Sequence, residues 1–167
     1  MTTTAETVTT ATQKTTQKLA DHKELLFQAL VPVEAANLVA LMENIVPHQD
    51  PELRNIVFYT ALCFDAGLAS DTALRTGVRA LLKELDQQAV TQGAASFAEA
   101  AADIQKSLLT AIEDRPLFQQ LVYSTVCDFY NRHIVWQAIG YPGLAQRDGK
   151  GYVNQGFDVL DWDDPTP

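Results

Sequence analysis

Apolar side chains recur at every third or fourth position over most of residues 31–140, which is the spacing of one face of an α-helix. Helix-start signals divide this pattern into short segments. Pro32 suits a first helical turn, and Asp50 and Asp71 are of the type that caps a helix N-terminus. No segment shows the alternation expected of a strand. The sequence therefore predicts an all-α fold, an irregular bundle of five to six helices with short connections and an extended aromatic C-terminal arm.

Five of the expected helices have a clear inward stripe. The expected inward positions are Leu38, Leu41, Met42, Ile45 and Val46; Leu53, Ile56, Val57, Thr60 and Phe64; Leu74, Val78, Leu81, Leu82 and Leu85; Phe97, Ala101, Ile104, Leu108 and Ile112; and Phe118, Leu121, Val122, Thr125, Val126, Phe129 and His133. Gly93 is placed to end the third helix, and Ser96 with Glu99 forms a capping box that predicts the start of the fourth. The fifth is expected to run from residues 114–116 to near Gly140.

The chain divides into three parts by composition. Residues 1–17 are rich in Thr and Gln with almost nothing apolar, so we expect them to be disordered. Residues 18–140 form the expected bundle, with a short, less regular helix over Leu19 to Leu30. Residues 141–167 combine glycines with aromatic residues and are expected to be a non-helical arm.

Charge and composition exclude several classes of protein. Asp and Glu number 21 against 12 Lys and Arg, a net charge of -9, which argues against nucleic-acid binding and against anionic membrane surfaces. No apolar run reaches the roughly 20 residues that cross a bilayer, so no membrane insertion is expected. Met1 to Gln17 contains no visible export signal. Cys63 and Cys127 lie in apolar helical patterns and are expected to be reduced and buried. A cytoplasmic location follows as the expectation.

Known catalytic motifs are missing. His22, His48 and His133 lie far apart, and none belongs to the Glu-x-x-His unit of di-iron bundles. No Cys-x-x-Cys pair, nucleophile elbow or nucleotide-binding glycine pattern occurs. Lys150 stands between glycines but follows no strand, which indicates a loop. We therefore expect no catalytic residue, no metal ligand and no cofactor in this chain.

His133 leaves one alternative open, because it continues the stripe of the last helix. It is read either as a packed histidine or as a proton-transfer group working with Asp128 or Tyr130. Asp128 is predicted to lie on a different helix face, which favours packing.

The aromatic side chains near the C-terminus must be buried against other residues. Glycine and proline break regular structure here, so one amphipathic helix cannot bury all of these side chains. They either staple the terminus to its own bundle or anchor in a groove of a partner. Their spread over many positions favours an interface. The candidate partner-binding residues are Trp136, Tyr141, Pro142, Tyr152, Phe157 and Trp162.

Two blocks of sequence carry a resemblance to a known family. Val31-Pro-Val-Glu34, followed by a helix up to Ile45-Val-Pro47, precedes Trp136-Gln-Ala-Ile-Gly-Tyr-Pro-Gly143. In order and separation these blocks resemble the gluconate 2-dehydrogenase subunit 3 family. The resemblance implies an all-helical, chaperone-like accessory subunit that binds a large flavoprotein of the glucose-methanol-choline type. The large chain would hold FAD and abstract hydride, and the small chain would hold no cofactor.

The expected function is therefore a non-catalytic small subunit of a FAD-dependent oxidoreductase complex acting on sugars or alcohols. Many relatives carry a twin-arginine signal that is not seen here, and the block Gly156 to Trp162 is no general family feature. Two alternatives stay open: a small helical enzyme that uses His133 in proton transfer, and a self-assembling protein that swaps its arm between identical copies.

Overall fold

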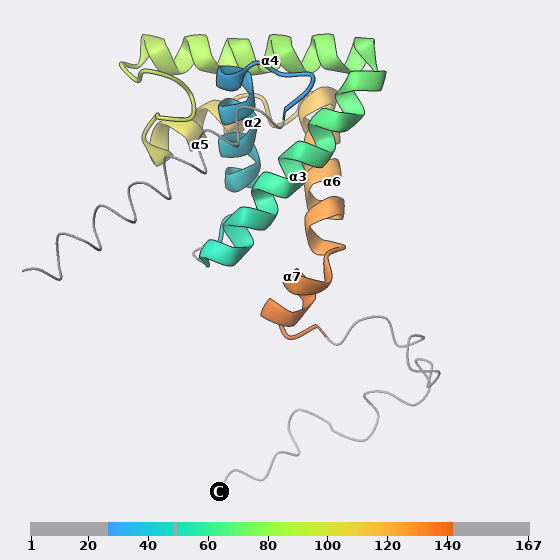
Figure 1. The fold of residues 1–167 in the computed structure, drawn as a ribbon. Helices are drawn as coiled ribbons and strands as arrows, with labels where there is room; N and C mark the ends of the chain where they lie inside the picture. The colour runs from blue at the N-terminus through green and yellow to red at the C-terminus, as the bar shows by residue number, and fades with distance from the viewer. Residues whose placement is uncertain (1–26, 49, 142–167) are drawn as a thin grey trace, which may run out of the picture. The chain divides into compact units, whose positions relative to one another are not determined.

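The computed structural model describes residues 27–48 and 50–141, and this part of the chain is helical without any strand (Figure 1). The all-α prediction is confirmed. The helices are α2 (Pro32–Ile45), α3 (Pro51–Ser70), α4 (Thr72–Thr91), α5 (Ala102–Thr110), α6 (Pro116–Tyr130) and α7 (His133–Ala138). The chain forms two compact units, of which the first ends at Phe129 and the second begins at Tyr130. The expected disordered residues 1–17 lie outside the described part.

The predicted caps are present. Asp50 accepts a hydrogen bond from the backbone N–H of Glu52 at 2.8 Å, and Asp71 accepts one from that of Leu74 at 2.9 Å. Pro32 stands at the first position of α2. The two aspartate side chains each satisfy a backbone N–H that the helix itself leaves unpaired.

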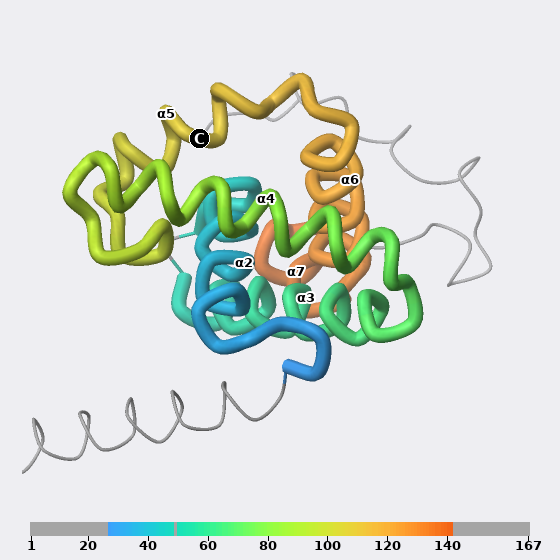
Figure 2. Tube along the Cα trace, turned by 90° about the horizontal axis from the view of Figure 1, so that it is seen from above, coloured from blue at the N-terminus to red at the C-terminus, as the bar shows by residue number. Residues whose placement is uncertain are grey.

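The core of the first unit is built around α2, which contacts α3, α4 and α5. Figure 2 shows α4 crossing α2. The predicted inward face of α2 is confirmed, since Leu38, Leu41 and Met42 are fully buried. The other large, fully buried side chains are Val57, Leu68, Val78, Leu82, Leu85, Phe97, Ile112, Leu121 and Phe129. Burying each side chain of this size stabilises the fold by about 1.5–3 kcal/mol.

The residues before α2 are fixed by a buried carboxylate. Asp65 on α3, which is 1% exposed, accepts hydrogen bonds from the backbone N–H groups of Gln28, Ala29 and Leu30. These backbone N–H groups therefore donate to a side chain and not to the carbonyl groups of a helix. The predicted helix over Leu19 to Leu30 is wrong in its described portion, and its earlier residues lie outside the described part.

The connection between α4 and α5 differs from the prediction. Gly93 has a φ of 90° just after α4, as expected of a glycine that ends a helix. The Ser96 hydroxyl accepts a hydrogen bond from the N–H of Glu99 at 3.2 Å, but this contact closes only a turn. α5 begins later, at Ala102, so the capping box was wrong as a helix start.

Side chains from two helices hold this connection in place. The N–H of Phe97 donates to the carboxylate of Asp86 at 3.0 Å, and the N–H of Ala98 donates to the amide oxygen of Asn37 at 2.9 Å. Asn37 also donates to Asp86 at 2.9 Å. Because α2 and α4 supply these partners, the segment keeps Phe97 in the core without being helical.

The last predicted helix is two helices. α6 ends at Tyr130, and Arg132 has an extended backbone (φ -90°, ψ 129°) that interrupts the helical pattern before α7. His133 is exposed at the start of α7, so its predicted place on the buried stripe is wrong. The predicted inward position of Val126 is also wrong, because Val126 is 36% exposed on the outer side of α6. Gly140 has a φ of 70° after α7.

Both cysteines lie in the described part and are exposed, without a disulfide between them. The prediction that Cys63 and Cys127 are buried is wrong. α3 and α6 carry apolar residues on their outer as well as their inner sides, so hydropathy does not separate the two faces. None of the helices described has the length and apolar character needed to span a membrane.

Candidate partner-binding surface

Three aromatic rings form a cluster in the second unit. The ring centroids of Trp136 and Tyr141 are 5.5 Å apart at an interplanar angle of 85°, and those of His133 and Trp136 are 6.1 Å apart at 63°. The indole N–H of Trp136 donates a hydrogen bond to the backbone carbonyl of Tyr130. Edge-to-face geometry of this kind contributes about 0.5–1.5 kcal/mol per pair beyond buried area. The cluster stabilises the short helix α7.

The same cluster presents apolar surface to solvent. Trp136 is half-buried, whereas Tyr141 is 43% exposed. Ile134 and Ile139 beside them are 39% and 52% exposed. Trp136 therefore holds its own unit together, and Tyr141 with Ile139 leaves more apolar surface exposed. The other candidate residues, Pro142, Tyr152, Phe157 and Trp162, lie outside the described residues.

A second apolar surface follows the outer side of α6 in the first unit. We call it the α6 outer face and define it by Tyr123, Val126 and Cys127. Tyr123 is 72% exposed and Val126 is 36% exposed. A hydrogen bond with the side chain of Cys127 raises the pKa of Tyr123 above its usual value.

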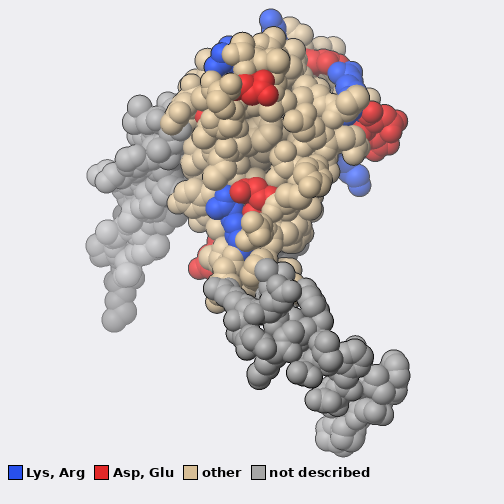
Figure 3. All heavy atoms as spheres, turned by 90° about the vertical axis from the view of Figure 1, so that its right-hand side faces the viewer, with Lys and Arg blue, Asp and Glu red and all other residues tan. Residues whose placement is uncertain are grey.

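The α6 outer face contains no charged side chain. Asp128 is the only charged residue of α6, and its carboxylate accepts a 2.7 Å hydrogen bond from the hydroxyl of Thr60 on α3. Another exposed tyrosine, Tyr59, lies on α3 and is 52% exposed. Figure 3 shows broad neutral areas between small groups of charged atoms. Exposed tyrosines with few charges are typical of the centre of a protein–protein interface.

The predicted partner-binding residues do not include this face, although the sequence contains a signal for it. Tyr123, Val126 and Tyr130 recur at helical spacing on the side opposite Leu121 and Phe129, in a helix with almost no charge. A surface helix normally carries charged residues there.

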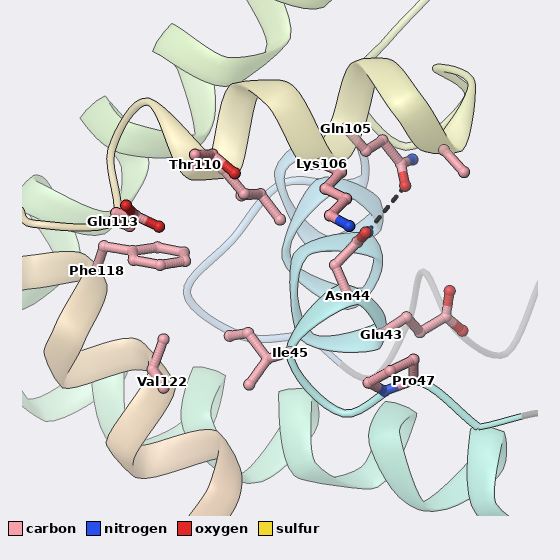
Figure 4. A pocket seen from close by; sticks show the side chains of 12 residues that line it. Glu43, Asn44, Ile45, Pro47, Gln105, Lys106, Thr110, Glu113, Phe118 and Val122 are labelled. Carbon is pink, nitrogen blue, oxygen red and sulfur yellow. Dashed lines mark hydrogen bonds between the residues drawn. The ribbon is translucent and has the colours of Figure 1, made fainter.

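A groove of about 620 Å³ lies where α2, α5 and α6 meet, within the first unit (Figure 4). Ile45, Phe118 and Val122 point toward one another at one end. At the other end, the side-chain amide of Asn44 donates to that of Gln105 at 2.9 Å. The groove is thus apolar on one side and polar on the other.

The two histidines within the described residues each contact an aromatic ring. The imidazole of His48 stacks on Phe129 with centroids 4.9 Å apart and an interplanar angle of 17°. Its Nε2 is buried without a hydrogen-bond partner, so this ring packs as an aromatic side chain. His133 contacts the edge of Trp136. The described residues contain no group of three His, Cys, Asp or Glu side chains that could hold a metal ion.

The described residues combine a helical fold with two exposed apolar surfaces that carry tyrosines, one on α6 and one around Tyr141. Residues 32–143 match the family model of gluconate 2-dehydrogenase subunit 3, so the chain belongs to that family. The resemblance carried by the Val31 and Trp136 blocks is thereby confirmed. No curated protein and no solved structure matches the chain. Membership in this family makes the chain an accessory subunit of a dehydrogenase complex.

Proposed function

We propose that this chain is the non-catalytic small subunit of a FAD-dependent oxidoreductase that acts on sugars or alcohols. A large partner subunit of the glucose-methanol-choline type holds FAD and carries out hydride transfer. The small subunit holds no cofactor and stabilises its partner in the cytoplasm. Family membership over residues 32–143 supports a place in a dehydrogenase complex.

The single observation that carries the proposal is the α6 outer face. Tyr123 leaves 72% of its surface in water on a helix whose one charged residue, Asp128, accepts a hydrogen bond from Thr60, although the chain as a whole is 20% charged. An uncharged aromatic face gains free energy when a partner covers it, because water is released from apolar surface. A stable heteromeric complex is the function that gives this face a role.

The second unit and the residues after it extend the proposed contact. Tyr141 and Ile139 are exposed, and Pro142, Tyr152, Phe157 and Trp162 supply further aromatic and apolar side chains along the sequence. Together with one face of the first unit, such a segment reaches the roughly 1,600 Å² buried by a standard interface. Truncating a well-buried aromatic anchor costs about 2–4 kcal/mol of binding.

Co-expression tests the proposal. The full chain is produced with a candidate large flavoprotein from its genome neighbourhood, with an affinity tag on the small chain only. The proposal predicts that flavin-containing large subunit is retained through purification and is less soluble when produced alone. A large subunit that folds, binds FAD and oxidises its substrate alone, and is not retained by the tagged chain, contradicts it. Turnover by the isolated small chain would support the alternative of a small enzyme.

A further inference from the structure

The break between α6 and α7 depends on one backbone angle. Arg132 has a φ of -90° and a ψ of 129°, and a ψ of about -42° would return it to the helical region. Neither proline nor glycine occurs between Tyr130 and His133. Among the described residues only Gly93 and Gly140 have a positive φ, so no residue at the break has the left-handed conformation that ends many helices. Every residue at the break can therefore adopt helical angles.

The period of apolar residues continues across the break. Val126, Tyr130 and Ile134 follow one another at four-residue spacing, and they are 36%, 40% and 39% exposed. In a continuous helix, residues at this spacing lie on one face. In the structure the same sequence forms two helices, so a contact outside the local pattern selects the break.

The side chain of Trp136 provides this contact. Its indole N–H donates to the backbone carbonyl of Tyr130, which a continuous helix would pair with the N–H of Ile134. A side chain in a helix covers the residues three and four positions before its own, and Tyr130 lies six positions before Trp136. The indole of Trp136 could therefore not reach this carbonyl in a continuous helix. The indole hydrogen bond and the continuous helix exclude each other.

α7 has little that stabilises it as a separate helix. It contains six residues, its N-cap Arg132 makes no side-chain capping hydrogen bond, and its first turn contains no acidic residue. A helix this short is marginal without tertiary contacts. Joining α6 and α7 would also remove one helix end and one helix start, whose backbone groups would then pair within the continuous helix. A single side-chain hydrogen bond can therefore decide between the two forms.

We propose that residues 130–133 are a two-state hinge, at which the chain exchanges between the broken form and one continuous helix over residues 116–138. The hydrogen bond from the indole of Trp136 stabilises the broken form. In the continuous form, Tyr130 and Ile134 extend the α6 outer face along one side of a single helix. The hinge thus sets the length of this apolar face. The inference concerns the isolated chain and does not require the proposed function.

Backbone NMR of the full-length chain tests the hinge. Trp136→Phe keeps an aromatic ring but removes the indole donor. We expect the Cα chemical shifts of Asn131 and Arg132 to move to helical values in this variant. The amide of Ile134 should exchange about tenfold more slowly, because it gains a helical hydrogen bond. Trp162→Phe makes the same substitution at the other tryptophan and is the matched control, which should leave these signals unchanged.

A proline at the start of α7 makes the opposite change. His133→Pro places proline at the first helical position, where its ring fits the helix and keeps the preceding residue extended, as Arg132 already is. The same substitution breaks a continuous helix. Added to Trp136→Phe, it should return the Asn131 shift and the Ile134 exchange rate to their wild-type values. His133→Ala removes the same ring without fixing the backbone, so it is the control and should leave the helical values in place.

Three results would overturn the inference. Unchanged shifts of Asn131 and Arg132 in Trp136→Phe would mean that the indole does not hold the break. Random-coil shifts for residues 133–138 in this variant would mean that the indole holds α7 itself, without a second helical form. Helical shifts at Asn131 that persist when His133→Pro is added would mean that they do not report a continuous helix.

Unchanged amide signals from α2 to α5 verify that the first unit stays folded in every variant. All of these measurements use the isolated chain. Failure of the hinge therefore leaves the proposed function standing, and failure of the large subunit to bind leaves the hinge standing.

Discussion

The carboxylate of Asp65 accepts the backbone N–H of Leu30 at 3.0 Å, although Asp65 is only 1% exposed. The same side chain also accepts from the N–H groups of Gln28 and Ala29. A buried carboxylate that accepts several N–H bonds is compensated for its lost hydration. Asp65 thereby fixes the chain where it enters α2, and it determines the first prediction.

Asp65→Asn should lower the free energy of unfolding by about 2–4 kcal/mol, because an amide turns a donor toward N–H groups that need an acceptor. The measurement is urea unfolding followed by circular dichroism. Asp103→Asn, at an exposed position on α5, is the control and should cost about 0.5 kcal/mol or less. Equal midpoints for the two variants would show that the buried contacts contribute nothing.

Phe97→Ala should lower the free energy of unfolding by about 3–5 kcal/mol, since Phe97 is fully buried although its segment is not helical. Thermal unfolding measures the loss. Val90→Ala removes an exposed apolar side chain nearby in sequence and should change stability by less than about 0.5 kcal/mol. A small effect of Phe97→Ala would mean that the connection between α4 and α5 is not part of the core.

Acid sensitivity should depend on Glu84 and Arg115. The hydrogen bond from Arg115 lowers the pKa of Glu84 below its usual 4.5, against a smaller opposing effect of burial. A lowered folded-state pKa contributes stability that is present above pH 4.5 and is lost as the pH falls through the folded-state pKa. The contribution is small because both side chains are largely exposed.

Arg115→Gln should therefore reduce stability slightly at neutral pH and approach the wild type below the folded-state pKa of Glu84. Urea midpoints across this acidic range provide the measurement. Lys83→Gln, on the exposed side of α4, removes a positive charge without removing this pair and serves as the control. A constant difference between Arg115→Gln and wild type at every pH would contradict the assigned cause.

Tyr123→Ser should weaken binding of the large subunit about tenfold or more without lowering thermal stability, because its side chain is exposed in the isolated chain. Isothermal titration with purified partner measures the affinity. Val90→Ser is exposed on α4 and should bind as the wild type does. If Tyr123→Ser retains full affinity, the α6 outer face is not part of the contact.

The sequence predicts the local features of this fold well. Asp50 and Asp71 cap helices as expected, and the inward face of α2 is confirmed through Leu38, Leu41 and Met42. These features follow from short-range chemistry, a capping side chain or a 3.6-residue period, which is legible without knowledge of the tertiary structure.

Features that no local sequence signal marks were predicted wrongly. Phe97 belongs to an irregular segment because Asp86 and Asn37, far away in sequence, bond its neighbouring backbone groups. The break before His133 arises from the extended backbone at Arg132, which no proline or glycine marks. Local patterns cannot signal either event.

The candidate site was predictable only in part. The Trp136 and Tyr141 block was recognised from its composition, and the structure describes the contact of these two rings. The α6 outer face was not predicted, because Val126 and Cys127 are apolar and hydropathy alone assigns them to the core. The groove depends on how α2, α5 and α6 meet, which periodicity does not contain.

Sedimentation of the large flavoprotein, followed by its flavin absorbance, tests the central claim most directly. Titration with the full-length small chain should shift all the flavin into one faster-moving species and saturate at a fixed ratio of the two chains. An unchanged flavin boundary at a saturating excess of the small chain would contradict the assignment of this protein as a stable subunit of that complex.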